Sequence, residues 1–249
     1  MAYKDDEFAP SGKKIDWIAP NGQINYVKGV GVDVPMPDMN DVMCELQLSA
    51  LGDFVPLCHL INTTDFKREI KAWDDKWVPY LRTTGVTNDR EGMMLVGMEG
   101  DTVGDSLSMP EIRKRVGRKL LESEINVPTE LYHAMPSLHP LLNAFDTLGR
   151  TMIVKLNKGG WFPPHRDHPV LSRDCFRIVA FCSENTDHST FEWEHDYRRR
   201  DIQPGRSYYV DTRKVHRTAC WGNDSIHLVM NIPKTWENVL KVMSMTQHY

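Results

Sequence analysis

The sequence predicts a mainly β fold with flanking helices: a C-terminal sandwich or barrel preceded by an α-rich N-terminal portion. Segments with apolar residues at helical spacing gather before residue 149. After Gly149, short apolar runs alternate with turn signals rich in Gly, Pro and Asn. Short strands at this rhythm are typical of sandwiches and barrels, a group that includes the jelly rolls. The length of 249 residues suits one large domain, or one domain with a substantial extension.

Three helices are expected on the N-terminal side. The first is capped at Thr64 and carries apolar residues on one face, namely Phe66, Ile70, Trp73 and Trp77. The second opens at Ser108, with a glutamate three residues on, and runs through Leu121. The third follows Ser137. A strand could lie over residues 93–98, and residues 1–35 are expected to form an irregular lead-in.

Five strands are expected on the C-terminal side, over residues 152–156, 176–182, 190–194, 207–211 and 226–232. The expected organisation is therefore an α-rich supporting region over 1–149, a β core over 150–235 and a C-terminal tail over 236–249. The boundary near residue 150 marks a change in the sequence pattern, from helical spacing to short strand-like runs. It does not imply two independent folding units.

Composition and charge narrow the classes of function. Hydrophobic residues at 41% and charged residues at 26% exclude a disordered chain, a collagen and a coiled-coil rod. The net charge of -4 argues against nucleic acid or an anionic membrane as a partner. The apolar runs are far shorter than the roughly 18 residues that cross a bilayer, and the polar N-terminus has no signal-peptide pattern. We therefore expect a soluble, cytoplasmic protein.

The five cysteines are odd in number and widely spaced, and they form no CxxC pair. Neither a disulfide framework nor a structural zinc site is expected from them. Cys175 and Cys182 lie in an apolar stretch, where small core residues are the simpler interpretation.

The chemistry is expected in the segment WFPPHRDH, which contains His165 and Asp167, together with His216 much later in the chain. Side chains two apart on an extended segment point the same way, so His165 and Asp167 can share one metal ion. A second imidazole from His216 would complete a facial set of two histidines and one carboxylate, the set typical of non-haem Fe(II). An HxD pair alone could also belong to a solvated turn. If Asp167 points toward the ion, the next residue on an extended segment, His168, points away from it.

Three segments resemble a known family: GGWFPPHRDH, FRIVAF and PGRSYYVDTRKVHRTACWGNDSIHLVMNI. They are similar to the Fe(II)/2-oxoglutarate-dependent oxygenases, and most similar to the aspartyl/asparaginyl β-hydroxylase-like branch. The resemblance covers about residues 150–233. It implies a double-stranded β-helix, a cupin-like jelly roll with iron at its mouth, and iron ligands at His165, Asp167 and His216. The presence of Asp167 implies hydroxylation rather than halogenation.

The resemblance also implies Fe(II) and 2-oxoglutarate as cofactors and dioxygen as a reactant. An arginine is a natural partner for the distal carboxylate of 2-oxoglutarate. The family usually carries a basic residue about ten residues after the distal histidine, but here His227 stands eleven residues on, beside Ser225. Arg177, a charge in an otherwise apolar strand, is the expected anchor, with His227 as a second contact. Lys155 is a weaker candidate for the same role.

The expected activity is hydroxylation of an amino acid, an amino-acid derivative or a peptide residue, although desaturation or cyclisation stays open. Two alternatives remain from the residues themselves. One is a cupin-type metal dioxygenase that does not use 2-oxoglutarate, and the other is a barrel that binds a ligand without catalysis. The sequence lacks a phosphate loop, a nucleophile elbow and an HExxH motif, so it does not support phosphotransfer or the common hydrolase activities.

Overall fold

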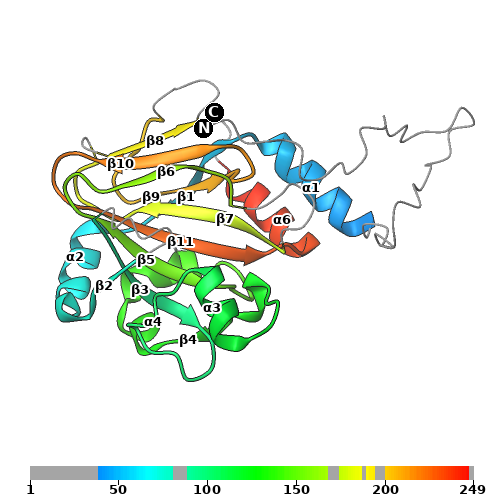
Figure 1. Cartoon of the computed structure of the whole chain (residues 1–249). Coiled ribbons are helices and arrows are strands. Elements are labelled where there is room, and N and C mark those ends of the chain that lie inside the picture. Colours follow the sequence, from blue (N-terminus) through cyan, green and yellow to red (C-terminus); the bar gives the residue numbers. More distant parts are fainter. Residues whose placement is uncertain (1–38, 81–88, 168–173, 187–188, 194–199, 247–249) are drawn as a thin grey trace, which may run out of the picture. The chain divides into compact units, whose positions relative to one another are not determined.

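The computed structural model describes residues 39–80, 89–167, 174–186, 189–193 and 200–246 (Figure 1). The chain divides into two units, Met1–Pro37 and Asp38–Tyr249, and the second contains all of the described residues. The irregular lead-in expected over residues 1–35 lies outside the described residues.

Two antiparallel sheets form the core of this second unit (Figure 1). In the described part of the chain, the larger sheet has eight strands in the order β1-β9-β7-β11-β5-β3-β2, with β4 paired to β3. Its strands are β1 (Phe54–Leu60), β2 (Val78–Pro79), β3 (Arg90–Gly97), β4 (Val127–Pro128), β5 (Thr151–Leu156), β7 (Cys175–Phe181), β9 (Arg206–Val210) and β11 (Ser225–Pro233). The smaller sheet has the order β6-β10-β8, with β6 (Trp161–His165), β8 (Ser189–Trp193) and β10 (His216–Cys220).

From β5 onward, consecutive strands alternate between the two sheets. The odd-numbered strands β5, β7, β9 and β11 belong to the larger sheet, and the even-numbered strands belong to the smaller one. This alternation is the topology of a jelly roll, in which two sheets enclose a common interior. The predicted fold class, a double-stranded β-helix core with flanking helices, is therefore confirmed.

Strand β7 shows why this part of the sequence is so apolar. Its alternate residues Phe176 and Ile178 join the main core cluster, which also contains residues of the helices. Val179 and Phe181 point to the opposite face and pack in the barrel interior with residues of β9. Because both faces of the strand are covered, both sets of alternating positions are apolar. Arg177 is the exception, and it belongs to the interior set.

The helices come mostly from the N-terminal side. They are α1 (Met39–Leu51), α2 (Thr63–Lys71), η2 (Asp74–Lys76), α3 (Met109–Val116), η3 (Glu122–Glu124), α4 (Glu130–Ala134), η4 (Pro136–Leu138), α5 (His139–Leu142) and α6 (Trp236–Ser244), where η denotes a 3-10 turn. Within the described residues, no helix combines the length and the apolar character needed to cross a bilayer. Helix α6 packs against α1 and occupies most of the segment expected as a tail (Figure 1).

The expected helices differ from the observed ones at their ends. Helix α2 is capped by Asn62, not Thr64, because the Asn62 Oδ1 accepts hydrogen bonds from the next turn. Its last residue is Lys71, so the Trp73 and Trp77 side chains pack on the core from beyond the helix. Helix α3 has the predicted capping box but ends at Val116, since Gly117 adopts a left-handed φ of 74°. The third expected helix is two short pieces, η4 and α5.

The N-terminal side also adds strands to the larger sheet. Strand β1 pairs with β9, and β3 pairs with β5. The sheet therefore continues across residue 150, within the single unit Asp38–Tyr249. The strand expected over residues 93–98 is β3, which begins earlier, at Arg90.

Candidate metal centre and cosubstrate pocket

Three side chains that could bind a metal meet where β6 and β10 pair. His165 ends β6 and His216 begins β10, and the two residues are direct partners in the antiparallel register. Their ring centroids lie 4.4 Å apart. Asp167 follows β6 and places its Oδ1 3.4 Å from the His165 Nε2 and its Oδ2 3.9 Å from the His216 Nε2. One ligand atom from each residue lies within 4.8 Å of the others, as one shared ion requires.

Backbone carbonyl groups orient both imidazoles. The His165 Nδ1 lies 2.7 Å from the Pro163 carbonyl oxygen, and the His216 Nδ1 lies 2.9 Å from that of Lys214. A hydrogen on each Nδ1 donates to its carbonyl, which leaves the lone pair of each Nε2 facing the shared centre. The backbone N–H of Asp167 donates to the Thr212 carbonyl over 3.1 Å. Local contacts therefore hold all three groups before any ion binds.

The charges of these groups suit a divalent cation. Burial alone would raise the pKa of the Asp167 carboxyl, but the Arg177 guanidinium and the two imidazoles outweigh it and hold this pKa well below its usual range. Burial lowers the pKa of His216 to about 4, against the opposing pull of Asp167. At neutral pH the site thus offers an ionised carboxylate and a neutral His216, the forms that bind metals.

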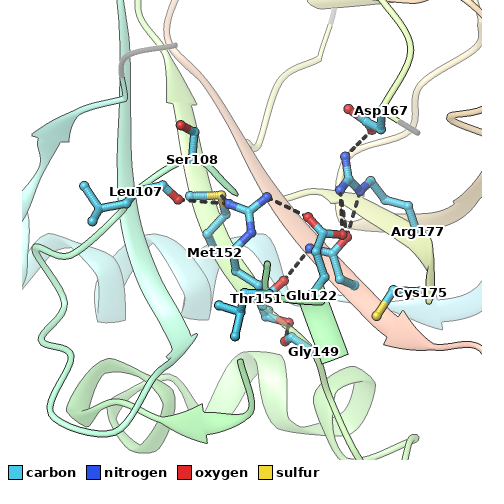
Figure 2. A network of polar contacts seen from close by, with 12 residues as sticks. Leu107, Ser108, Glu122, Gly149, Thr151, Met152, Asp167, Cys175 and Arg177 are labelled. Carbon is cyan, nitrogen blue, oxygen red and sulfur yellow. Dashed lines mark hydrogen bonds and ion pairs between the residues drawn. The ribbon is translucent and has the colours of Figure 1, made fainter. Parts of the chain in front are cut away.

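Arg177 is the link between the metal centre and the rest of the cavity wall. Its Nη1 donates to the Asp167 Oδ2, while its Nε and Nη2 donate to the Asn231 Oδ1 over 3.0 and 2.7 Å. The same Nη2 lies 3.5 Å from the Glu122 Oε2 (Figure 2). Of the five N–H groups of an arginine, one on Nη1 has no partner among the described residues. Arg177 therefore retains one donor, and it lines the cavity.

His227 lines the same cavity and lies two residues after Ser225 on β11. Its Nε2 lies 2.7 Å from the Ser225 Oγ, and its ring meets the edge of Phe181 at a centroid distance of 4.7 Å. Burial lowers the pKa of His227 to about 4, so the imidazole is neutral at pH 7. It can offer a neutral hydrogen bond to a ligand but no charge.

The sequence also offered Lys155 as a weaker cosubstrate contact and raised His168 as a possible metal ligand. The Lys155 Nζ pairs with the Glu91 Oε2 at 2.5 Å and lies 4.5 Å from the ring centroid of Trp77, so it is engaged away from the cavity wall. His168 lies outside the described residues.

The cavity enclosed by the two sheets measures about 330 Å³. The metal-ligand candidates and Arg177 stand on its wall, and Met152, Val179 and Val229 give it an apolar lining. A volume of this size is at the lower end of small-molecule pockets. It would hold a small diacid beside the metal centre, with the apolar wall keeping water away.

Sequence reasoning missed three residues around Arg177: Glu122, Arg150 and Asn231. Asn231 is a polar residue in the apolar strand β11, directly opposite Arg177 of β7. Two polar residues in adjacent apolar strands each need a partner, and that signal could have found this pair. Glu122 lies in a short turn between helix and strand, where nothing in the local pattern distinguishes it from the neighbouring Glu124.

No family model and no curated protein matches this sequence. Among solved structures, an oxidoreductase of the 2OG-Fe(II) oxygenase family from Burkholderia pseudomallei is 15% identical, with a TM-score of 0.45, covering 78% of this chain and 90% of that one. A Pseudomonas putida prolyl-4-hydroxylase is 10% identical, with a TM-score of 0.43, covering 77% and 99%. A Trichoplax adhaerens prolyl hydroxylase, in complex with a hypoxia inducible factor peptide fragment, is 12% identical, with a TM-score of 0.43, covering 84% and 94%. Similarities of this size do not extend to activity, which depends on the residues of the site.

Proposed function

We propose that this protein is a non-haem Fe(II)- and 2-oxoglutarate-dependent oxygenase that hydroxylates an amino acid, an amino-acid derivative or a peptide residue. The observation that carries the proposal is the convergence of His165, Asp167 and His216 at one face of a cavity between the two sheets. Two imidazole nitrogens and one carboxylate oxygen form a donor set that suits Fe(II) and leaves coordination positions open. Zinc sites are more often built with thiolates or a third histidine.

For 2-oxoglutarate, the proposed anchor is Arg177. It is charged, lines the cavity beside Asp167, and keeps one Nη1 hydrogen for a carboxylate oxygen. A guanidinium and a carboxylate form a strong, charge-assisted pair where water is excluded. His227 is the proposed second contact, and Ser225 fixes its ring. Because His227 is neutral, Arg177 supplies the charge that a dicarboxylate requires.

With dioxygen, Fe(II) and 2-oxoglutarate held at this site would supply an oxidant that replaces a C–H hydrogen by hydroxyl, with 2-oxoglutarate converted to succinate and carbon dioxide. The chain's own contribution is positional. The paired strands β6 and β10 hold two ligands on one side of the centre and leave the other side facing the cavity. The apolar side chains of β5, β7 and β11 exclude water from that space.

The finer assignment, to the aspartyl/asparaginyl β-hydroxylase-like branch, rests on the resemblance of residues 150–233 to that branch. The same resemblance supports an amino-acid or peptide substrate. A reducing, cytoplasmic location would suit Fe(II) and the five cysteines, which are all free.

Anaerobic titration with Fe(II), with and without 2-oxoglutarate, tests the proposal. We expect a visible charge-transfer absorption only when both are present, because it arises from 2-oxoglutarate chelating the iron. Iron binding without any response to 2-oxoglutarate would instead support a cupin-type dioxygenase. Absence of iron binding would support a barrel without catalysis. Screening amino acids and peptides for succinate release that depends on the added compound then identifies the substrate.

A further inference from the structure

Four charged side chains that line the cavity alternate in sign, beginning at the metal centre: Asp167, Arg177, Glu122 and Arg150. Glu122 lies between two guanidinium groups: its Oε1 is 3.1 Å from the Arg150 Nη2, and its Oε2 is 3.5 Å from the Arg177 Nη2 (Figure 2). Arg177 in turn contacts Asp167. The four side chains are between 3% and 13% exposed. Buried charges of this kind are tolerated when each one is paired, and Glu122 is the shared partner of both arginines.

The backbone holds Glu122 in this place. The backbone N–H of Arg150 donates to the Glu122 carbonyl oxygen over 3.0 Å, and that of Gly149 donates to the Asn231 carbonyl over 2.7 Å. A Cβ on residue 149 would lie 2.8 Å from the Glu122 carbonyl oxygen, so glycine permits this close approach. The turn η3, which lies outside the jelly-roll strands, is thereby fixed to the start of β5 and the end of β11.

Asn231 also restricts Arg177. Its Oδ1 accepts both hydrogen bonds from Arg177, and its Nδ2 donates to the Arg150 carbonyl over 2.6 Å. Both ends of the amide are used, so the oxygen must face Arg177. With Glu122 and Asn231 on one side, Arg177 presents its Nη1 to the Asp167 Oδ2. The other carboxylate oxygen, Oδ1, is then the one nearer the His165 Nε2.

We propose that Glu122 is a positioning residue of the metal centre. Acting through Arg177, it orients the Asp167 carboxylate so that Oδ2 faces Arg177 and Oδ1 faces the His165 Nε2, the side on which an ion would be shared with the two histidines. The inference rests on the proposed function insofar as the ion is the one expected there. It adds that the N-terminal side of the chain takes part in metal binding through a residue that does not touch the metal.

The test compares Glu122→Gln with Glu124→Gln in the full chain, using Co(II) as the probe. Glutamine keeps the size of the side chain and one acceptor but removes the charge that faces the two arginines. Glu124 lies in the same turn, and its carboxylate pairs with the exposed Arg118, so its variant is a matched control. The measurements are the Kd for Co(II), the visible absorption of the bound Co(II), and the midpoint of thermal unfolding without metal.

We expect Glu122→Gln to weaken Co(II) binding by about tenfold or more, as loss of an outer-sphere partner does, and to change the Co(II) spectrum. Glu124→Gln should match the wild type in both. If Glu122→Gln keeps the wild-type Kd and spectrum and only its unfolding midpoint falls, Glu122 is structural and the inference is wrong.

A double variant covers the case in which Glu122→Gln does not fold because Arg150 has lost its partner. Glu122→Gln with Arg150→Gln removes one charge of each sign and should restore folding, while Co(II) binding stays weakened. A double variant that folds and binds Co(II) like the wild type would show that Glu122 serves only to neutralise Arg150. Wild-type protein that binds no Co(II) would contradict the proposed function as well as this inference.

Discussion

His165 and His216 are direct partners across the antiparallel strands β6 and β10, and their ring centroids lie 4.4 Å apart. Fifty-one positions separate them in the numbering of the chain. The register of two strands therefore creates the two-imidazole side of the candidate metal centre, and a change of register by one residue would turn one ring to the opposite face.

Replacing any one of the three ligand candidates should weaken iron binding and abolish hydroxylation. We expect Asp167→Ala, His165→Ala and His216→Ala each to lower the affinity for Fe(II) by more than about tenfold, since even outer-sphere changes reach that size. Anaerobic Fe(II) titration and succinate release measure the two effects. His168→Ala is the control and should keep most of the iron affinity. If it is as damaging as His165→Ala, the assumed phase along this segment is wrong.

Arg177→Met should raise the 2-oxoglutarate concentration needed for succinate formation by at least about tenfold. Truncating one partner of a buried charge pair costs about 2–5 kcal/mol, and 1.4 kcal/mol is about a factor of ten. Because Arg177 also contacts Asp167, iron affinity should fall too, so the titration is made at saturating Fe(II). His227→Ala should show a smaller rise. If His227→Ala loses affinity for 2-oxoglutarate and Arg177→Met does not, the residue that anchors 2-oxoglutarate lies on β11 and Arg177 is structural.

The buried His227 should make the free energy of unfolding depend on pH. Burial lowers its pKa from 6.5 to about 4 in the folded chain. Below pH 6.5 the unfolded chain therefore binds a proton that the folded chain does not bind until about pH 4, so stability is full above pH 6.5 and falls through this window. The expected loss from this group is about 2 kcal/mol between pH 7 and pH 5.

Urea unfolding of the metal-free wild type and of His227→Asn at several pH values measures this contribution. Asparagine does not titrate, so the stability of this variant should depend less on pH, by about the amount given above. His216 is present in both proteins, and its own contribution cancels in the comparison. If the free energy of unfolding depends on pH in the same way in both proteins, the pKa of His227 is not lowered by folding.

Gly149→Ala should lower the free energy of unfolding by about 1–3 kcal/mol, the usual cost of overpacking. The added Cβ would lie 2.8 Å from the Glu122 carbonyl oxygen and 3.0 Å from that of Asn231, and backbone atoms cannot move aside cheaply. Gly104→Ala is the control, because the nearest atom to its Cβ is a side-chain carbon at 3.7 Å. Urea unfolding of both variants checks the difference. Equal free energies of unfolding of the two variants would show that η3 can move away from the added Cβ without a loss of stability.

Local patterns in the sequence were sufficient to predict β5, β7, β8, β9 and β11 after Gly149, but not β6 and β10, which carry the two histidines. They also predicted the capping box at Ser108 and the placement of His165 and Asp167 on one face. Each depends on residues a few positions apart, whose spacing decides the direction of their side chains. The same patterns misplaced the start of α2, because Asn62 competes with Thr64 for the same cap. They also ran α3 past Gly117, whose left-handed conformation ends the helix.

Only the tertiary structure decided which distant residues meet. The partners of Arg177 come from three places in the chain: Asp167 after β6, Asn231 on β11 and Glu122 in η3. Strand pairing and the burial of both faces of the larger sheet set these contacts, and neither is encoded in the spacing around any one residue. A buried guanidinium requires partners, but only the folded chain shows that one of its partners is the carboxylate expected at the metal and another is a glutamate from η3, a turn outside the jelly-roll strands.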